Sequence, residues 1–239
     1  MRIFFLLILL MLMSFMAKVN AKVISHHFRI GNTTVVILQE NNGPGKTFIH
    51  VHQNEVTALK AARQVIRLKG GGIITLVHPG GRNICFTLKG KRYEFDPNRI
   101  YTDEGIKKTL TEYGNYDVGA HKLVRKFAGE ITKLLPSGKI IAVHNNESYS
   151  LKDYLPGNHL EKDVSLINYN KENFYRNFYF LTNMSDFTRL TKMNFNGVLQ
   201  STNATDDGSL SIFLADRNFI NVEAGYSELT QQIDMLMHA

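Results

Sequence analysis

The sequence predicts an α/β fold, a single domain whose mixed β-sheet is covered by helices on both faces. Three observations predict it. Short apolar runs bounded by turn residues alternate with longer stretches whose apolar residues recur at helical spacing. Hydrophobic residues make up 44% of the 239 positions and charged residues 21%, which supports one sizeable core and excludes disorder. No internal repeat or low-complexity tract indicates a solenoid.

Residues 1–21 have the features of a secretory signal peptide. Arg2 precedes an apolar run over residues 3–16, and Val19-Asn20-Ala21 supplies a cleavage pattern of small residues. The run is shorter than the roughly 20 residues that span a bilayer, although an uncleaved anchor is the alternative. We therefore expect a secreted or periplasmic protein without a stable membrane anchor, and a single domain over residues 22–239.

Strands and helices alternate through the first part of this domain. Gly31-Asn32 separates two alternating runs and predicts a β-hairpin of residues 23–30 and 33–39. Short apolar runs between turn residues predict strands over residues 47–51, 73–77, 83–88 and 92–95. Apolar residues three and four positions apart predict helices over residues 55–68, 103–112 and 120–135.

The rest of the chain continues this order. We expect strands over residues 139–143, 177–181, 210–214 and 218–222, and a terminal helix over residues 229–237. The strand over residues 139–143 stops at His144. In an α/β sheet, functional side chains gather at strand ends, which directs attention to such positions.

Charge and cysteine content limit the class of partner. The segment of residues 1–21 holds two of the 28 basic residues and none of the 21 acidic ones, so the mature chain has a net charge of +5. This is typical of a mildly basic soluble surface or of attraction to an anionic cell wall or membrane. Basic residues do not cluster with aromatic ones, so no nucleic acid partner is expected. Cys85 is the single cysteine, which excludes an intrachain disulfide.

A candidate metal site begins just after a predicted strand. His52 and Glu55 are three residues apart, and zinc prefers histidine nitrogen and carboxylate oxygen. A catalytic zinc needs three protein ligands and one open position, and His144 at a strand end is the best third ligand. His50 and His78 are competing ligands; alternation places His50 on the face of His52, where it could also support the site or belong to the core.

Four further polar side chains extend this candidate site. Asn98 and Arg99 form a turn after an apolar strand, and the guanidinium of Arg99 is a planar fork suited to a carboxylate. Arg82 offers a second guanidinium, although an arginine taken alone is more often a surface salt-bridge partner. Glu223 ends an apolar strand, where burial of a carboxylate favours a general base.

In chain order these residues resemble the motif of the zinc carboxypeptidases of the M14 metallopeptidase family. That motif is His-x-x-Glu, a later Arg, an Asn-Arg pair, a His and a late Glu, and the resemblance runs from about Phe48 to the C-terminus. His52-Gln53-Asn54-Glu55 is also similar to the His-Gly-Asn-Glu of the succinylglutamate desuccinylase and aspartoacylase branch. The resemblance implies a zinc carboxypeptidase-like fold.

The resemblance also implies a role for each matched residue. His52, Glu55 and His144 would hold one Zn²⁺ per chain. Glu223 would be the catalytic base that later protonates the leaving amine, and Arg82 would stabilise the oxyanion. Asn98 and Arg99 would bind the free carboxylate of the substrate.

Two departures from the family pattern stand out. The family has a mobile Tyr about twenty residues before the catalytic Glu, whereas residues 201–209 contain none. Asp206 and Asp207 in that segment either bind an amine of the substrate or form a polar turn. The chain is also short for the family, which predicts trimmed loops around the substrate pocket.

The expected function is a secreted zinc-dependent hydrolase that cleaves an amide bond next to a free carboxylate. The favoured substrate is a bacterial cell-wall (peptidoglycan) stem peptide, which carries free carboxylates and an amine, cleaved by a carboxypeptidase or amidase. A zinc deacylase of small N-acyl amino acids is the first alternative. The second is a non-catalytic binding protein with a relic zinc site, against which Glu223 argues because a binder needs no general base.

Overall fold

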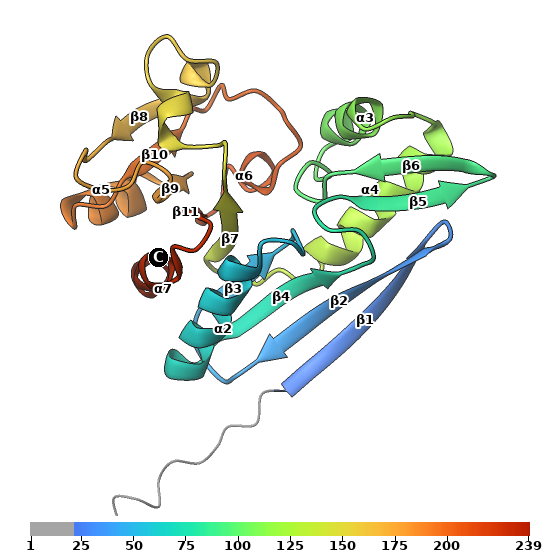
Figure 1. The fold of residues 1–239 in the computed structure, drawn as a ribbon, viewed down its shortest axis with the longest axis horizontal. Helices are drawn as coiled ribbons and strands as arrows, with labels where there is room; N and C mark the ends of the chain where they lie inside the picture. The colour runs from blue at the N-terminus through green and yellow to red at the C-terminus, as the bar shows by residue number, and fades with distance from the viewer. Residues whose placement is uncertain (1–21) are drawn as a thin grey trace, which may run out of the picture.

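The computed structural model describes residues 22–239, and a nine-stranded mixed sheet forms its centre (Figure 1). The order across this sheet is β1-β2-β4-β3-β7-β11-β9-β10-β8. Its strands are β1 (Lys22–Ile30), β2 (Thr33–Asn41), β3 (Thr47–His50), β4 (Gly72–Val77), β7 (Ile140–Asn146), β8 (Val164–Asn168), β9 (Phe178–Leu181), β10 (Gly197–Gln200) and β11 (Phe219–Gly225). The predicted signal peptide, residues 1–21, lies outside the described residues and stays a prediction.

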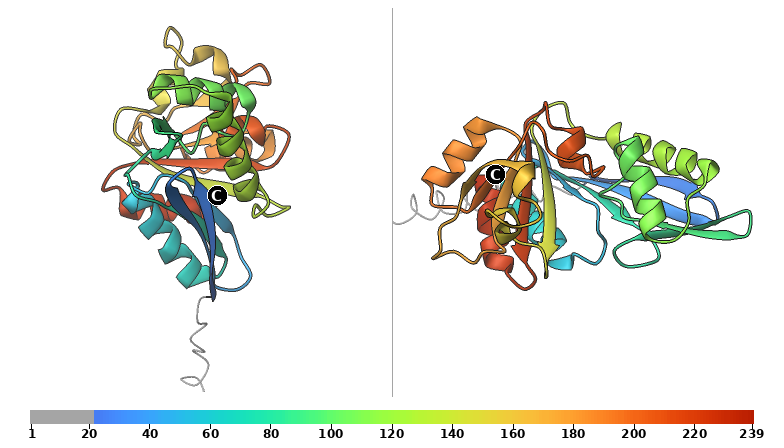
Figure 2. Two further views of the ribbon diagram at one scale, coloured as in Figure 1. Left: turned by 90° about the vertical axis from the view of Figure 1, so that its right-hand side faces the viewer. Right: turned by 90° about the horizontal axis from the view of Figure 1, so that it is seen from above.

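Helices cover both faces of the sheet (Figure 2), as the sequence predicted. On one face lie α2 (Val56–Lys69), α5 (Met184–Lys192) and α7 (Leu229–His238). On the other lie α3 (Asp103–Glu112), α4 (Val118–Thr132), the short α6 (Leu210–Phe213) and a separate antiparallel hairpin of β5 (Ile84–Leu88) and β6 (Lys91–Phe95). Two 3₁₀ turns, η1 (Leu151–Tyr154) and η2 (Glu161–Asp163), precede β8.

Alternation along the central strands builds the two cores. In β7, Ile140 and Ala142 face the layer of α3 and α4, whereas Ile141 and Val143 face α2 and α7. All these side chains are buried, since the strand lies between two helical layers. The predicted fold class, an α/β domain with a mixed sheet covered on both faces, is therefore confirmed. Within residues 22–239, no helix combines the length and the apolar character needed to cross a membrane.

The predicted strand over residues 210–214 is wrong, because this segment forms the helix α6. Leu214 N donates to Leu210 O at 2.9 Å, and Phe213 N donates to Ser209 O at 3.1 Å, which is helical bonding. Leu210 and Leu214 are both 1% exposed. The two leucines that pack into the core are therefore four positions apart, as on one face of a helix. A five-residue apolar run does not by itself separate a strand from one helical turn.

Other differences concern elements that were missed or that end elsewhere. The strands β8 and β10 and the nine-residue helix α5 were not predicted. The strand β7 continues two residues beyond His144, so this histidine lies inside the strand and takes a fixed orientation from it.

The central strands β4, β3, β7 and β11 are parallel, so their carboxyl ends meet at one edge of the sheet. The segments that follow or end these strands carry the candidate ligands and the candidate base. The candidate site therefore lies at the edge where ligands bind in α/β sheets.

Candidate metal centre and the adjoining cavity

A tight turn aligns His52 and Glu55 after β3. Glu55 N donates to His52 O at 3.0 Å, which closes the turn just before α2 begins at Val56. The Glu55 carboxylate makes no capping bond to its own helix. It is therefore available to neighbouring side chains, close to a helix N-terminus that favours negative charge.

His52, Glu55 and His144 form a buried group, called here the His-Glu-His group. His52 Nδ1 lies 2.9 Å from Glu55 Oε1, and His144 Nδ1 lies 2.9 Å from Glu55 Oε2. The two Nδ1 atoms are 3.2 Å apart. Zinc bonds of about 2.0–2.1 Å place tetrahedral ligand atoms roughly 3.3 Å apart, so this spacing fits a single ion.

Asp96 orients the first histidine of this group. His52 Nε2 lies 2.7 Å from Asp96 Oδ1, which assigns the ring proton to Nε2 and leaves Nδ1 as the nitrogen available to a metal. Asp96 follows β6 directly and is 5% exposed. A carboxylate behind a histidine ligand is a common supporting arrangement in metal sites.

His50 supports the main chain of the turn and is not part of the His-Glu-His group. Its Nε2 lies 3.0 Å from Glu55 O, and its Nδ1 lies 2.8 Å from Thr75 Oγ1. Burial lowers the pKa of His50 to about 4, so the ring is neutral and donates from Nε2 to the carbonyl. His78, the other competing ligand, is also buried and lies outside the group.

An amide network on the opposite face of the sheet fixes His144. Gln232 Nε2 donates to His144 O at 2.9 Å, and Asn145 Nδ2 donates to Gln232 Oε1 at 2.9 Å. Asn145 N donates to Glu55 Oε2 at 3.1 Å. The network therefore joins β7 to α7 and to the ligand carboxylate.

Opposite charges inside the group outweigh the effect of burial. Burial lowers the pKa of His52, yet Glu55 and Asp96 raise it to about 9. Burial raises the pKa of Glu55, yet His52 and His144 hold it well below its usual range. The pKa of Asp96 is lowered in the same way, mainly by His52. Glu55 and Asp96 are therefore ionised and hold a proton on His52, and a bound divalent cation would displace that proton from Nδ1.

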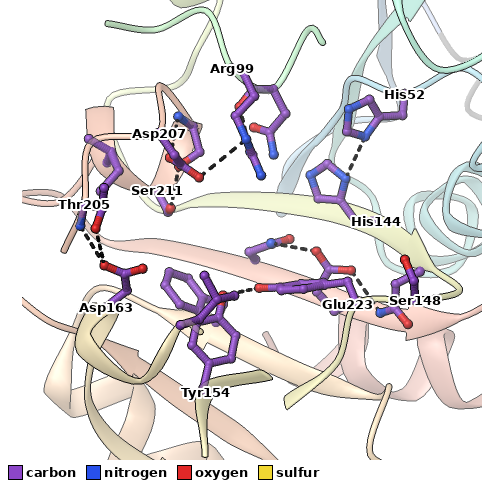
Figure 3. Close-up of a pocket in the computed structure, with 18 of the residues that line it drawn as sticks. His52, Arg99, His144, Ser148, Tyr154, Asp163, Thr205, Asp207, Ser211 and Glu223 are labelled. Atoms are coloured by element: carbon purple, nitrogen blue, oxygen red, sulfur yellow. Dashed lines mark hydrogen bonds and ion pairs between the residues drawn. The ribbon is translucent and has the colours of Figure 1, made fainter. Parts of the chain in front are cut away.

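The His-Glu-His group opens into a cavity of about 760 Å³. Figure 3 shows His52, His144, Arg99 and Glu223 around one space, with Asp207 beside Arg99. All seven residues proposed from the sequence line this cavity: His52, Glu55, Arg82, Asn98, Arg99, His144 and Glu223.

Glu223 is the sheet neighbour of His144. The two residues are register partners in the parallel pair of β11 and β7, so their side chains emerge on the same face. Asn146 Nδ2 donates to Glu223 Oε2 at 3.1 Å, and Asn221 Nδ2 donates to Glu223 Oε1 at 3.0 Å. The carboxylate is therefore held in one orientation beside the candidate metal centre.

Arg82 contacts the candidate metal centre directly. Its guanidinium donates to Glu55 Oε1 at 2.7 Å and lies 3.4 Å from Asp96 Oδ2. The side chain is 45% exposed, so it reaches the group from the open side of the cavity. It pairs here with a ligand carboxylate, in line with the salt-bridge alternative, whereas the family resemblance implied an oxyanion donor.

Arg99 and Asn98 lie on another wall of the cavity. Arg99 Nε lies 3.4 Å from Asp207 Oδ2, and Arg99 NH1 donates to Asn98 O at 3.0 Å. Asp206 instead accepts from Thr102 Oγ1 at 2.7 Å. The two aspartates therefore do not form an amine-binding pair: Asp207 neutralises Arg99, and Asp206 belongs to the turn.

Sequence reasoning missed two side chains of this site, Asp96 and Tyr154. Asp96 was read only as part of a turn, although an acid directly after an apolar strand was a usable signal. Tyr149 and Tyr154, from the segment after β7, line the cavity with their hydroxyl groups hydrogen-bonded to each other. Burial first, and the charge of Glu223 as well, raise the pKa of both phenols, so they are neutral donors. The run Ser148-Tyr149-Ser150 directly after His144 could be interpreted from the sequence as a pocket lining or as a simple turn, whereas no local pattern identified Tyr154.

Fold and site together define an α/β protein with a buried His-Glu-His group suited to a metal ion and an adjoining polar cavity. No protein-family model matches the sequence, and no curated protein matches it. Among solved structures, the chain is similar to an aspartoacylase family protein from Mesorhizobium loti, with 13% sequence identity and a TM-score of 0.45. The similarity covers 93% of this chain and 66% of that protein, so the chain spans just under two thirds of its length. A likeness at this identity and TM-score does not establish a family.

Proposed function

We propose that this protein is a zinc-dependent hydrolase that cleaves an amide bond next to a free carboxylate. The observation that supports it most is the presence in one cavity of the His-Glu-His group, the adjacent carboxylate of Glu223 and the guanidinium of Arg99. A metal site, a base and a carboxylate-binding group are the parts that such a reaction needs.

Each side chain has a definite task in this proposal. His52, Glu55 and His144 would hold zinc, which when bound lowers the pKa of water toward 7 and polarises a carbonyl. Glu223 takes a proton from the attacking water and returns it to the leaving amine.

The two arginines position the substrate. Arg82, at the open side of the cavity, moves from Glu55 toward the carbonyl oxygen as negative charge develops there. Asn98 and Arg99 bind the free carboxylate on the next wall, where a guanidinium donates two parallel hydrogen bonds.

We favour a peptide as the substrate. A cavity of about 760 Å³ accommodates several amino-acid residues, more than a small N-acyl amino acid needs. The net charge of +5 calculated for residues 22–239 suits an anionic cell wall, so a stem peptide of peptidoglycan remains our preferred candidate. Secretion depends on residues 1–21 and is part of the proposal.

The first test is the zinc content of the purified protein by elemental analysis, after zinc has been supplied. We expect about one zinc per chain in the unaltered protein and almost none in His52→Ala. His159→Ala is the matched control, since His159 lines the same cavity outside the His-Glu-His group and its loss leaves the zinc content unchanged. An unaltered protein without zinc contradicts the proposal.

The second test separates the candidate reactions. Peptides with a free terminal carboxylate, the same peptides capped as carboxamides, and N-acyl amino acids are incubated with the zinc-loaded protein. Release of an amino acid from the uncapped peptides supports the carboxypeptidase or amidase. Turnover of N-acyl amino acids alone indicates a deacylase, and zinc binding without any turnover indicates a binding protein.

A further inference from the structure

Two tyrosines pack against the aromatic residues of β9, beside the proposed base. Phe178 in β9 is the antiparallel register partner of Glu223 in β11, so the two side chains emerge on the same face of the sheet. The Tyr149 ring lies 5.5 Å from the Phe178 ring, and the Tyr154 ring lies 5.4 Å from the Phe180 ring, measured between centroids. Both tyrosines line the cavity, so their hydroxyl groups belong to the same part of it as Glu223.

A capped 3₁₀ turn holds both tyrosines in place. Tyr149 directly precedes Ser150, the N-cap of η1, and Tyr154 is the last residue of η1. Ser150 and Asp153 form a capping box, in which Ser150 N donates to Asp153 Oδ2 at 2.7 Å. Lys152 N donates to Ser150 Oγ at 3.2 Å. The turn and the aromatic contacts together fix the position of the two hydroxyl groups before any ligand binds.

The two hydroxyl groups have one more proton than they use. Tyr149 Oη and Tyr154 Oη hydrogen-bond to each other, and this bond takes one of their two protons, whichever oxygen donates. Within residues 22–239, neither hydroxyl has a second hydrogen-bond partner, so the other proton is available to a group in the cavity. Figure 3 shows this bond of Tyr154 as a dashed line beside Glu223. Burial raises the pKa of both phenols, so both keep their protons at neutral pH.

A neutral O–H donor beside a carboxylate favours an uncharged acceptor. A ligand carboxylate bound to the two tyrosines would lie near the carboxylate of Glu223, and like charges repel. Arg99, on another wall, is the group suited to a carboxylate. A ligand ammonium group has no lone pair with which to accept. A carbonyl oxygen, which has lone pairs and no net charge, is the ligand group that fits this position.

The carbonyl at the tyrosines differs from the one that would be cleaved. In the proposed reaction the cleaved carbonyl lies at the His-Glu-His group. Figure 3 shows Tyr154 well separated from His52, on the other side of Glu223. One carbonyl oxygen does not reach both places, so the tyrosines would contact a second carbonyl of the same ligand.

We propose that the Tyr149–Tyr154 pair donates a hydrogen bond to a second carbonyl oxygen of the ligand, so that the cavity prefers a peptide to a simple N-acyl amino acid. This inference deepens the proposed function and rests on it for the place of the cleaved bond. An N-acyl amino acid has one amide carbonyl beside its carboxylate, whereas an acylated dipeptide has a second carbonyl one residue further on. The substrate class is therefore an acylated dipeptide or a longer peptide.

Equilibrium binding of two achiral ligands tests this inference without turnover. N-acetylglycylglycine carries the second carbonyl, and N-pentanoylglycine has the same chain length with methylene groups in place of that amide. The full chain is treated with a chelator, so that neither ligand is hydrolysed, and is titrated with each ligand by calorimetry. The ligands also differ in an N–H group and in apolar surface. The ratio of their two dissociation constants is therefore compared between variants.

The double variant Tyr149→Phe/Tyr154→Phe removes the proposed donor. It removes both partners of the hydroxyl pair and leaves no group unpaired, so we expect it to fold normally, as urea denaturation checks. Its preference for N-acetylglycylglycine should fall by about three- to tenfold, the worth of a neutral hydrogen bond. Tyr93→Phe is the matched control, because Tyr93 is buried outside the cavity, and it should keep the full preference.

An unchanged preference in the folded double variant overturns the inference, and so does a lack of measurable binding of both ligands to the unaltered chain. The single variants Tyr149→Phe and Tyr154→Phe identify the oxygen that contacts the ligand, because only the loss of that hydroxyl should lower the preference. They also decide the question if the double variant does not fold. A preference that is unchanged in both single variants would then contradict the inference.

The outcomes for the tyrosine pair and for the proposed function are distinguishable. A preference that depends on the tyrosines, in a protein without zinc uptake or hydrolysis, supports carbonyl binding and overturns the proposed function. Zinc-dependent hydrolysis by a protein whose preference does not depend on the tyrosines overturns this inference and leaves the hydrolase proposal intact.

Discussion

The two ends of the cavity differ in how completely their polar groups are engaged. At the His-Glu-His end, Glu55 is 1% exposed and accepts from side chains and backbone at once. At the other end, Arg99 is 38% exposed, and besides its bond to Asn98 O it has one long contact, to Asp207. Asp163 has no cation partner among the described residues. The first end rests on parallel strands of the sheet, and the second on loops. A rigid scaffold thus holds the groups suited to chemistry, whereas loops carry the groups suited to selecting a ligand.

Removing the proposed base should have the largest effect. Glu223→Gln keeps the hydrogen-bonding shape and removes the ability to take a proton, so we expect turnover to fall by about 10²–10⁴-fold. Zinc content should stay the same, because Glu223 lies outside the His-Glu-His group. Turnover and zinc are measured on the same sample. Undiminished turnover would remove Glu223 from the mechanism.

Removing the charge that orients His52 should have the next largest effect, and this effect should be limited to zinc binding. Asp96→Asn removes the charge behind His52 Nε2, and we expect zinc affinity to fall by about 10–100-fold. Competition with a chelator measures it. Asp216→Asn, an exposed acid far along the chain, is the control. Equal zinc affinity in the two variants would contradict the supporting role of Asp96.

Truncating Arg99 tests the opposite end. Arg99→Ala should raise KM for substrates with a free terminal carboxylate by roughly tenfold, the worth of a charged hydrogen bond, and leave zinc unaffected. Substrates capped as carboxamides are the comparison. An equal loss with both substrates would refute carboxylate recognition by Arg99.

The smallest effect on chemistry is expected where backbone packing positions the loop that carries Asp207. Gly208 has φ of 76°, and a Cβ there would lie 2.5 Å from Gly105 Cα and 2.6 Å from Arg99 O. Gly208→Ala should therefore lower the free energy of unfolding by about 1–3 kcal/mol, measured by urea denaturation. Gly129→Ala, inside α4 with open space around it, should be neutral or stabilising. Similar values for the two variants would exclude close packing at Gly208.

Several features could be predicted because they are local. The hairpin of β1 and β2 and the helix α3 follow from short-range spacing and turn residues, with predicted boundaries close to the observed ones, and the start of β7 was predicted to within one residue. The order His52, Glu55, Arg82, Asn98, Arg99, His144 and Glu223 was visible in the chain, and the structure places all seven around one cavity.

Long-range contacts decided the rest. Asp96 reaches His52 across 44 residues, and Gln232 reaches His144 O across 88. No local pattern contains such pairs. The segment over residues 210–214 is a helix because this conformation buries both Leu210 and Leu214 in the core. A short apolar run alone is compatible with a strand or a helix.

The sequence by itself determined the α/β class, most of the elements and the chemical identity of the candidate ligands, because hydrophobic period and side-chain chemistry are properties of neighbouring residues. Only the tertiary structure decided that Glu223 is the register partner of His144, that Asp207 pairs with Arg99 and that Asp163 faces the cavity without a cation. The physical reason is that strand order and loop placement bring together residues far apart in the chain. Burial then sets the charge and the hydrogen-bonding partners of each group.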